Sequence, residues 1–142
     1  MGILAESFTK YLEEKQIRYG CKKIAVPGSE EECDRVQVIF AGTQRPDIAI
    51  NFIFDDVNKD VHIRVIDIVP EIGKDRRPAA LEIINEVNTL YNYARFCITD
   101  NGRLEFGMDA LINEDCSAPF CYELMRKALK ICVESYDCLC RI

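Results

Sequence analysis

The stretch from residue 78 to residue 104 shows most clearly how hydrophobic and polar positions alternate along the chain. Over residues 78–91 the apolar positions recur with a helical period and gather on one face, which predicts an amphipathic helix. Over residues 93–99 apolar and polar positions alternate, and the alternation resumes after the next turn. Asn101-Gly102 between two alternating runs predicts a tight β-hairpin in which Gly102 has a positive φ.

Asparagines along one edge of this helix leave two interpretations open. In the first, Asn92 caps the C-terminus of the helix, and Asn85 and Asn88 are solvated. In the second, Asn85 and Asn88 bind neighbouring backbone, because asparagine is otherwise a poor residue inside a helix. We therefore treat Asn85, Asn88 and Gly102 as candidate structural positions.

The same patterns predict the remaining elements. A hydrophobic stripe predicts a first helix over residues 3–16, and strict alternation predicts strands over residues 36–40, 48–55 and 61–65. The connections between these three strands are short, so we expect an antiparallel meander.

Two further segments complete this pattern. Residues 21–26 begin or form a short strand, and residues 118–136 predict a last helix. Ser117 is the expected N-cap of this helix, and Pro119 lies in its first turn.

Two predicted surfaces carry more apolar residues than one core needs. Ile39, Ile53 and Ile66 occupy the otherwise polar side of the three strands, and they would form an apolar row if they aligned. The last helix has a wide apolar arc that includes Tyr122, Leu129 and Val133. Scattered exposed residues of this kind are common. The alternative is a partner-binding or dimer surface, which contiguous apolar patches usually mark.

The length and composition favour one folded domain over residues 1–142. The chain has 142 residues, of which 49% are hydrophobic and 30% charged. We expect an α+β fold with an antiparallel sheet of about five strands in the order α-βββ-α-ββ-α. The formal net charge of −6 argues against sequence-independent nucleic-acid binding, and no apolar run is long enough to span a membrane.

The eight cysteines are expected to be reduced and mostly buried. The N-terminus lacks the pattern of a secretory signal, which favours a cytoplasmic location where disulfides are rare. No Cys-x-x-Cys occurs and His62 is the only histidine, so we expect no metal site and no cofactor. The pair Cys138 and Cys140 is interpreted as part of the tail, with metal or redox use as the alternative.

The residues for catalysis or phosphate binding are not arranged in any known motif. A nucleophile–base pair has little support from a single histidine, and no glycine-rich cofactor loop is present. The acidic run at 30–32 could attract a cation, but we interpret it as a solvated loop. Residues 55–60 resemble half of a calcium loop without its central glycine and bidentate glutamate, and we interpret them as a turn. Gly73-Lys74 lacks the spacing of a phosphate loop. We therefore predict that the protein is not an enzyme.

Several short motifs resemble a known family. They are Asn85-x-x-Asn88 with Val87, residues 95–98, residues 100–105, residues 109–111 and a final helix headed by Ser117. Together with the element order, these motifs resemble the YbjN-like family of putative bacterial sensory-transduction regulators, within the type III secretion chaperone-like fold. The resemblance implies protein–protein binding, since chaperone-like members of the fold are acidic homodimers that hold segments of partner chains. It brings no catalytic residues.

Two functions remain from the sequence. The first is a non-enzymatic protein-binding module, a chaperone-like adaptor or regulator that forms a homodimer, with no nucleic-acid or membrane partner. The second is a small-ligand-sensing regulator that uses the open face of the sheet.

Overall fold

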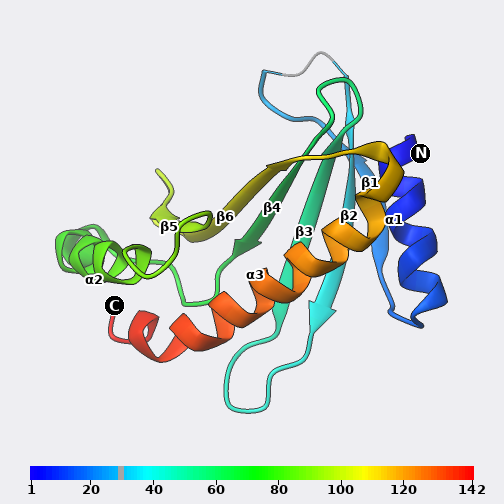
Figure 1. The fold of residues 1–142 in the computed structure, drawn as a ribbon. Helices are drawn as coiled ribbons and strands as arrows, with labels where there is room; N and C mark the ends of the chain where they lie inside the picture. The colour runs from blue at the N-terminus through cyan, green and yellow to red at the C-terminus, as the bar shows by residue number, and fades with distance from the viewer. Residues whose placement is uncertain (29–30) are drawn as a thin grey trace.

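A computed structural model describes residues 1–28 and 31–142 and has an α+β architecture (Figure 1). Three helices and one antiparallel sheet of six strands make up the described chain. The helices are α1 (Ile3–Glu14), α2 (Arg77–Asn88) and α3 (Ser117–Leu139). The strands are β1 (Gly20–Ile24), β2 (Cys33–Phe40), β3 (Ile48–Asp55), β4 (Asp60–Ile66), β5 (Arg95–Ile98) and β6 (Leu104–Leu111). The expected fold class is confirmed, with one strand more than predicted.

The order of strands in the sheet is β1-β2-β3-β4-β6-β5. The predicted antiparallel meander is β2, β3 and β4, and the predicted hairpin is β5 and β6. The sixth strand is β1, at the segment that the sequence indicated as the start or whole of a short strand over residues 21–26; it pairs with β2 and has no buried residue. Because neither face of β1 is buried, its sequence lacks the alternation that identified the other strands.

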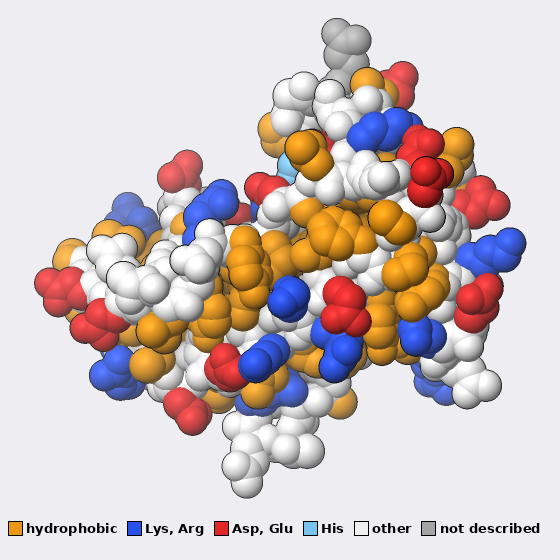
Figure 2. Space-filling model, viewed as in Figure 1, with side chains coloured by type: hydrophobic (Ala, Val, Ile, Leu, Met, Phe, Trp, Pro, Cys, Tyr) orange, Lys and Arg blue, Asp and Glu red, His pale blue; other side chains and the backbone are white. Residues whose placement is uncertain are grey.

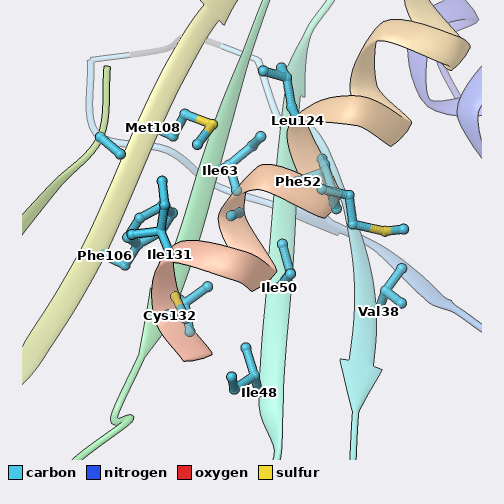
Figure 3. Packing of buried hydrophobic residues seen from close by; sticks show 14 of the residues in the cluster. Val38, Ile48, Ile50, Phe52, Ile63, Phe106, Met108, Leu124, Ile131 and Cys132 are labelled. Atoms are coloured by element: carbon cyan, nitrogen blue, oxygen red, sulfur yellow. The ribbon is translucent and has the colours of Figure 1, made fainter. Parts of the chain in front are cut away.

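All three helices pack on one face of the sheet (Figure 1). In Figure 3, Leu124, Ile131 and Cys132 of α3 lie among inward-facing residues of the strands. At the other end of the core, the ring centroid of Phe8 in α1 lies 4.6 Å from that of Phe52. The sheet thus has one buried face, and its opposite face is left open.

The N-terminus of α1 is fixed by two carboxylates from the sheet side. The Gly2 amide donates a hydrogen bond to Asp34 at 2.8 Å, and the Leu4 amide donates one to Asp56 at 3.1 Å. A Cβ at residue 2 would lie 1.7 Å from a carboxylate oxygen of Asp56, so a larger residue there would displace this side chain. These bonds satisfy amide groups that the first turn of a helix leaves without a partner.

The structure corrects two predicted helix ends. α2 ends at Asn88 with Thr89 as its C-cap, so Asn92 does not cap the helix. Ser117 is the first residue of α3 rather than its N-cap, and its buried hydroxyl has no hydrogen-bond partner among the described residues. The side chain of Asn113 caps the preceding 3₁₀ turn instead, accepting from the Asp115 amide at 3.0 Å.

The expectation that the cysteines are mostly buried is wrong. Cys33, Cys121 and Cys132 are buried and Cys97 is half-buried, but four others are exposed: Cys21, Cys116, Cys138 and Cys140. The exposed ones lie on the edge strand β1 or at the two ends of α3, where the helix leaves the core. Within the described chain none of these four forms a disulfide.

Two further expectations concern loops and membranes. Part of the predicted acidic loop, Glu30, lies outside the described residues. No helix in the described ranges is long and apolar enough to cross a membrane.

Candidate functional site

The outer edge of β6 has a strand partner along only half of its length. β5 lies opposite the first half of β6: Ile98, its last residue, is opposite Leu104, and Arg95, its first residue, is opposite Gly107. No residue of β5 lies opposite β6 beyond Gly107. β6 continues to Leu111, paired with β4 on its other side. The last four residues of β6 therefore have no strand beside them on the β5 side, within the chain that the structure describes.

The direction of the backbone hydrogen bonds shows which groups are left open. The carbonyl of Leu104 and the amide of Ile112 both bond to the chain on the β4 side, at 3.1 and 2.8 Å, whereas the carbonyl of Arg103 bonds to Thr99 on the β5 side, at 2.8 Å. In an antiparallel ladder these directions alternate residue by residue. The N–H and C=O groups of Asp109 and Leu111 therefore point to the open side.

The other two edges of the sheet are protected. The side-chain amide of Asn88 donates to the Phe96 carbonyl at 2.9 Å and accepts from the Phe96 amide at 2.7 Å, so it takes the place of a neighbouring strand beside β5. The opposite edge is β1, a five-residue strand that carries Lys22 and Lys23. Short strands and lysine are common means of preventing edge pairing. Of the three, the β6 edge is the one left accessible.

Apolar side chains surround this edge. Leu111 is 80% exposed, more than any other large hydrophobic residue described. Tyr93, which is half exposed, and Asp109 line the same hollow of about 260 Å³ where β5 ends. Lys127 of α3 lies 5.7 Å from the Tyr93 ring, and the exposed Phe120 lies two helical turns away on the same side of α3. Figure 2 shows hydrophobic side chains gathered along α3 and between α3 and β6.

The open face of the sheet carries a charged network centred on Asp109. Its carboxylate accepts from Arg64 at 2.7 Å and lies 2.9 Å from the Nδ1 atom of His62. The Nε2 atom of His62 lies 3.2 Å from Asp60. Burial acts to raise the pKa of Asp109, but the hydrogen bonds from Arg64 and His62 outweigh it and the pKa lies below its usual value. The network holds Asp109 in place with its backbone at the free edge.

Gly107 lies beside the Arg64 side chain of this network. A Cβ on Gly107 would lie 3.4 Å from the Arg64 guanidinium, which crosses β6 at this position. Arg64 also approaches Glu105 at 3.6 Å. The charges around Asp109 are thus paired with one another.

The thiols of Cys97, Cys121 and Cys132 are not activated. Burial is the main cause that raises the pKa of Cys97, and it raises the pKa values of Cys121 and Cys132 to about 12. A thiol is nucleophilic as the thiolate, which a raised pKa disfavours. No group of three metal-ligating side chains occurs among the described residues. The arrangement around β6 is suited to binding through backbone and apolar contacts.

The isoleucines predicted on the open face do not form one row. Ile39 pairs with Ala49, whereas Ile53 lies between Arg35 and His62, so the two are separated along the strands. Ile39 and Ile66 are exposed, and Ile53 is half-buried. The pairing register, which the alternation pattern does not specify, sets this separation.

Part of the wide arc of α3 is covered within the chain. Tyr122 packs against Tyr11 of α1, with ring centroids 5.7 Å apart, and Lys15 lies over both rings. Leu129 is half-buried, and Val133 is 42% exposed. The candidate dimer surface on α3 is therefore narrower than its sequence indicates.

Of the three candidate structural positions, Asn88 and Gly102 have the expected role and Asn85 does not. Asn88 makes the backbone contacts of the second interpretation, while Asn85 is exposed. Gly102 has a φ of +79° in the β5–β6 turn, as expected. Asp109 and Leu111 were not among the candidate site residues. Residues 109–111 appeared in the sequence only as one of the short motifs of the family resemblance, which assigned them no binding role.

Comparison with known proteins assigns no relative. No protein-family model matches the chain, and no curated protein matches it either. What the chain does is therefore inferred from its own geometry.

Proposed function

We propose that this protein is a non-enzymatic protein-binding module, a chaperone-like adaptor that takes an extended segment of a partner chain at the free edge of β6. The observation that carries the proposal is the pair of outward-pointing residues, Asp109 and Leu111, beyond the end of β5. An extended peptide that adds a strand there gains main-chain hydrogen bonds, and neighbouring side chains select its sequence.

The surroundings of the edge indicate the kind of segment that fits. Alternate side chains of an added strand face opposite sides of the sheet. On the helix side they would meet Tyr93 and Phe120, which favours apolar residues. On the open side they would lie beside the exposed Leu111 and the paired carboxylate of Asp109. We expect a segment that is apolar on one side and mixed on the other.

The same proposal includes the wider setting of the protein. We place it with the YbjN-like bacterial proteins of the type III secretion chaperone-like fold, in the cytoplasm, as a homodimer. The α+β architecture and the net charge of −6 are compatible with this placement.

The test is selection of peptides followed by amide hydrogen exchange. Peptides selected from a random library on the purified protein should slow exchange of the Asp109 and Leu111 amides. Leu111→Pro removes one outward N–H without removing a ladder bond to β4, and it should abolish binding while the fold persists. The control is at Leu90, a leucine just after α2 that is 71% exposed. Proline there would remove the hydrogen bond from the Leu90 amide to the Val87 carbonyl, so the control variant is Leu90→Asp, which should bind the peptides normally. Selected peptides that protect other amides would contradict the proposal.

A further inference from the structure

A hollow of about 380 Å³ lies between the segment that joins β4 to α2 and the last turns of α3. Its apolar wall consists of buried residues from both elements: Ile68, Val69, Ile72 and Leu139. Small-molecule sites have volumes of about 300–1,000 Å³ and are lined mainly by apolar side chains with a few polar groups. The hollow is at the small end of this range.

The wall formed by this segment is held at both ends. The Asp67 amide donates to the Leu104 carbonyl at 3.1 Å, and the Ile72 amide donates to the Gly102 carbonyl at 2.8 Å. Asp67 has a φ of +63°, a left-handed conformation that residues other than glycine rarely adopt. Residues 68–71 thus lie between two positions that are hydrogen-bonded to the β5–β6 hairpin. The hollow exists before any ligand arrives, which lowers the cost of binding.

Two opposite charges line the hollow and are not used within the chain. Glu71 and Arg76 are both exposed, and neither forms an ion pair with another residue in the described ranges. The other polar side chains of the lining are Tyr136 and Cys140, and interaction with the Cys140 thiol is the main cause of the raised pKa of Tyr136. The hollow therefore presents one carboxylate, one guanidinium and an apolar wall.

We propose that this hollow binds a free α-amino acid with an apolar side chain. Glu71 would bind the ammonium group, Arg76 the carboxylate, and the side chain would cover the accessible apolar lining at Pro46, Pro70 and Ile142. The planar guanidinium of an arginine can donate two parallel hydrogen bonds to the two oxygens of a carboxylate. The proposal concerns a site separate from the β6 edge, and it does not depend on the proposed function.

Charge complementarity distinguishes this ligand from others of similar size. A fatty carboxylate would match Arg76 and the wall, but Glu71 would repel it. An alkylamine would match Glu71 and would be repelled by Arg76. A zwitterion that carries both charges on one carbon uses both groups.

The test is titration of ¹⁵N-labelled protein with leucine, octanoate and hexylamine, read from amide chemical shifts. Leucine should bind with a Kd of about 1 mM or below and shift amides of residues 68–76 and 136–142. Octanoate and hexylamine should each bind at least about tenfold more weakly, a loss of roughly 1.4 kcal/mol. Octanoate binding as tightly as leucine, or leucine shifts confined to other residues, would overturn the proposal.

Exposed residues allow matched variants. Arg76→Gln and Glu71→Gln should each weaken leucine binding about tenfold, because each removes one charged partner. Lys74→Gln removes an equal charge two residues from Arg76, outside the lining, and should leave the affinity unchanged. Cys140→Phe places a bulky side chain in the hollow and should abolish the shifts. Leu111→Pro should bind leucine normally, so that failure of this site and failure of the β6 edge are distinguishable.

Discussion

At the scale of single residues, Gly102 is needed for both its conformation and its size. Its φ of +79° disfavours any side chain, and a Cβ there would lie 2.7 Å from the Ile72 carbonyl oxygen. We expect Gly102→Val to lower the free energy of unfolding by about 2 kcal/mol or more, because a β-branched residue combines strain with a clash. Urea denaturation measures the change.

Gly20 provides the control for this substitution. It lies in β1 at a φ outside the left-handed region, and a Cβ there would meet no atom within 4 Å. Gly20→Val should therefore be neutral or slightly stabilising. Equal effects at the two glycines would contradict the account given for Gly102.

Asn88 is a second residue with a local role that can be isolated. Its side chain makes both hydrogen bonds to the backbone of Phe96, a residue that is only 2% exposed. Asn88→Ala should lower the free energy of unfolding by about 2 kcal/mol, because it leaves two backbone groups without partners. Asn85→Ala, one turn earlier and exposed, should have an effect below about 0.5 kcal/mol. Thermal or chemical denaturation measures the unfolding free energy of both variants, and equal losses would contradict a special role of Asn88.

The cysteines differ in reactivity for reasons that the structure identifies. Exposed Cys116, Cys138 and Cys140 should react rapidly with an aromatic disulfide reagent in the native protein. Cys121 and Cys132 should react only after unfolding, since burial excludes the reagent and raises their pKa values to about 12. Mass spectrometry of the labelled native protein gives the order. Early labelling of Cys121 or Cys132 would show that α3 opens locally.

At the scale of elements, α1 depends on charge at its N-terminus. Burial of Asp34 acts to raise its pKa, but hydrogen bonds from Lys23 and the Gly2 amide outweigh it and lower the pKa. A folded-state pKa below the unfolded value stabilises the protein above the unfolded pKa, and this stabilisation is lost as the pH falls through the folded pKa. Asp34→Asn should therefore destabilise the protein at pH 7, and its effect should shrink as the pH falls from about 4 through the lower folded-state pKa of Asp34. Thermal unfolding across this pH range tests the sign, and a constant difference would contradict it.

The elements that could be predicted from sequence are those with one buried face. α1, α2, α3 and five strands each have apolar residues at the period of their structure, because each packs against the same core. β1 lacks this signal since the sheet edge leaves it exposed on both faces. The β5–β6 turn was identified by its own residues, Asn101-Gly102, independently of any distant contact.

The candidate site could not be predicted in the same way. The free edge at Asp109 and Leu111 results from the position where β5 ends relative to β6, and therefore from pairing between distant residues. The contact between His62 and Asp109 joins residues 47 positions apart. The prediction that Ile39, Ile53 and Ile66 align in one row was wrong for the same reason. Alternation gives the face on which each residue lies, but it leaves the register between strands undetermined.

At the scale of the whole molecule, two surfaces with exposed apolar residues, on α3 and on the open face of the sheet, could form a contact between two copies of the chain. α1 covers Tyr122 on one side of α3, while Val133 remains 42% exposed beside the half-buried Leu129. The open face of the sheet exposes Ile39 and Ile66 as well. A two-fold contact through either surface would bury apolar area that a monomer leaves in water.

The expected homodimer can be tested at α3 without disturbing the core. Light scattering of the purified protein should give the mass of two chains. Val133→Glu should shift it to one chain, because a carboxylate in an apolar contact is costly to bury. Leu129→Glu is less informative, since a charge at a half-buried position also disturbs packing within the chain. Val57→Glu makes the same change at a valine that is 73% exposed in the β3–β4 turn, and it should remain dimeric.

The outcome also locates the contact. A wild-type protein that dimerises and is unaffected by Val133→Glu would exclude α3, and Ile39→Glu and Ile66→Glu would then test the open face of the sheet. A wild-type protein that stays monomeric at high concentration would remove the dimer. The apolar arc of α3 would then be accounted for by its packing against α1 and α2 within one chain, since Tyr91 after α2 already contacts Glu134 and Ser135 on the far half of the helix.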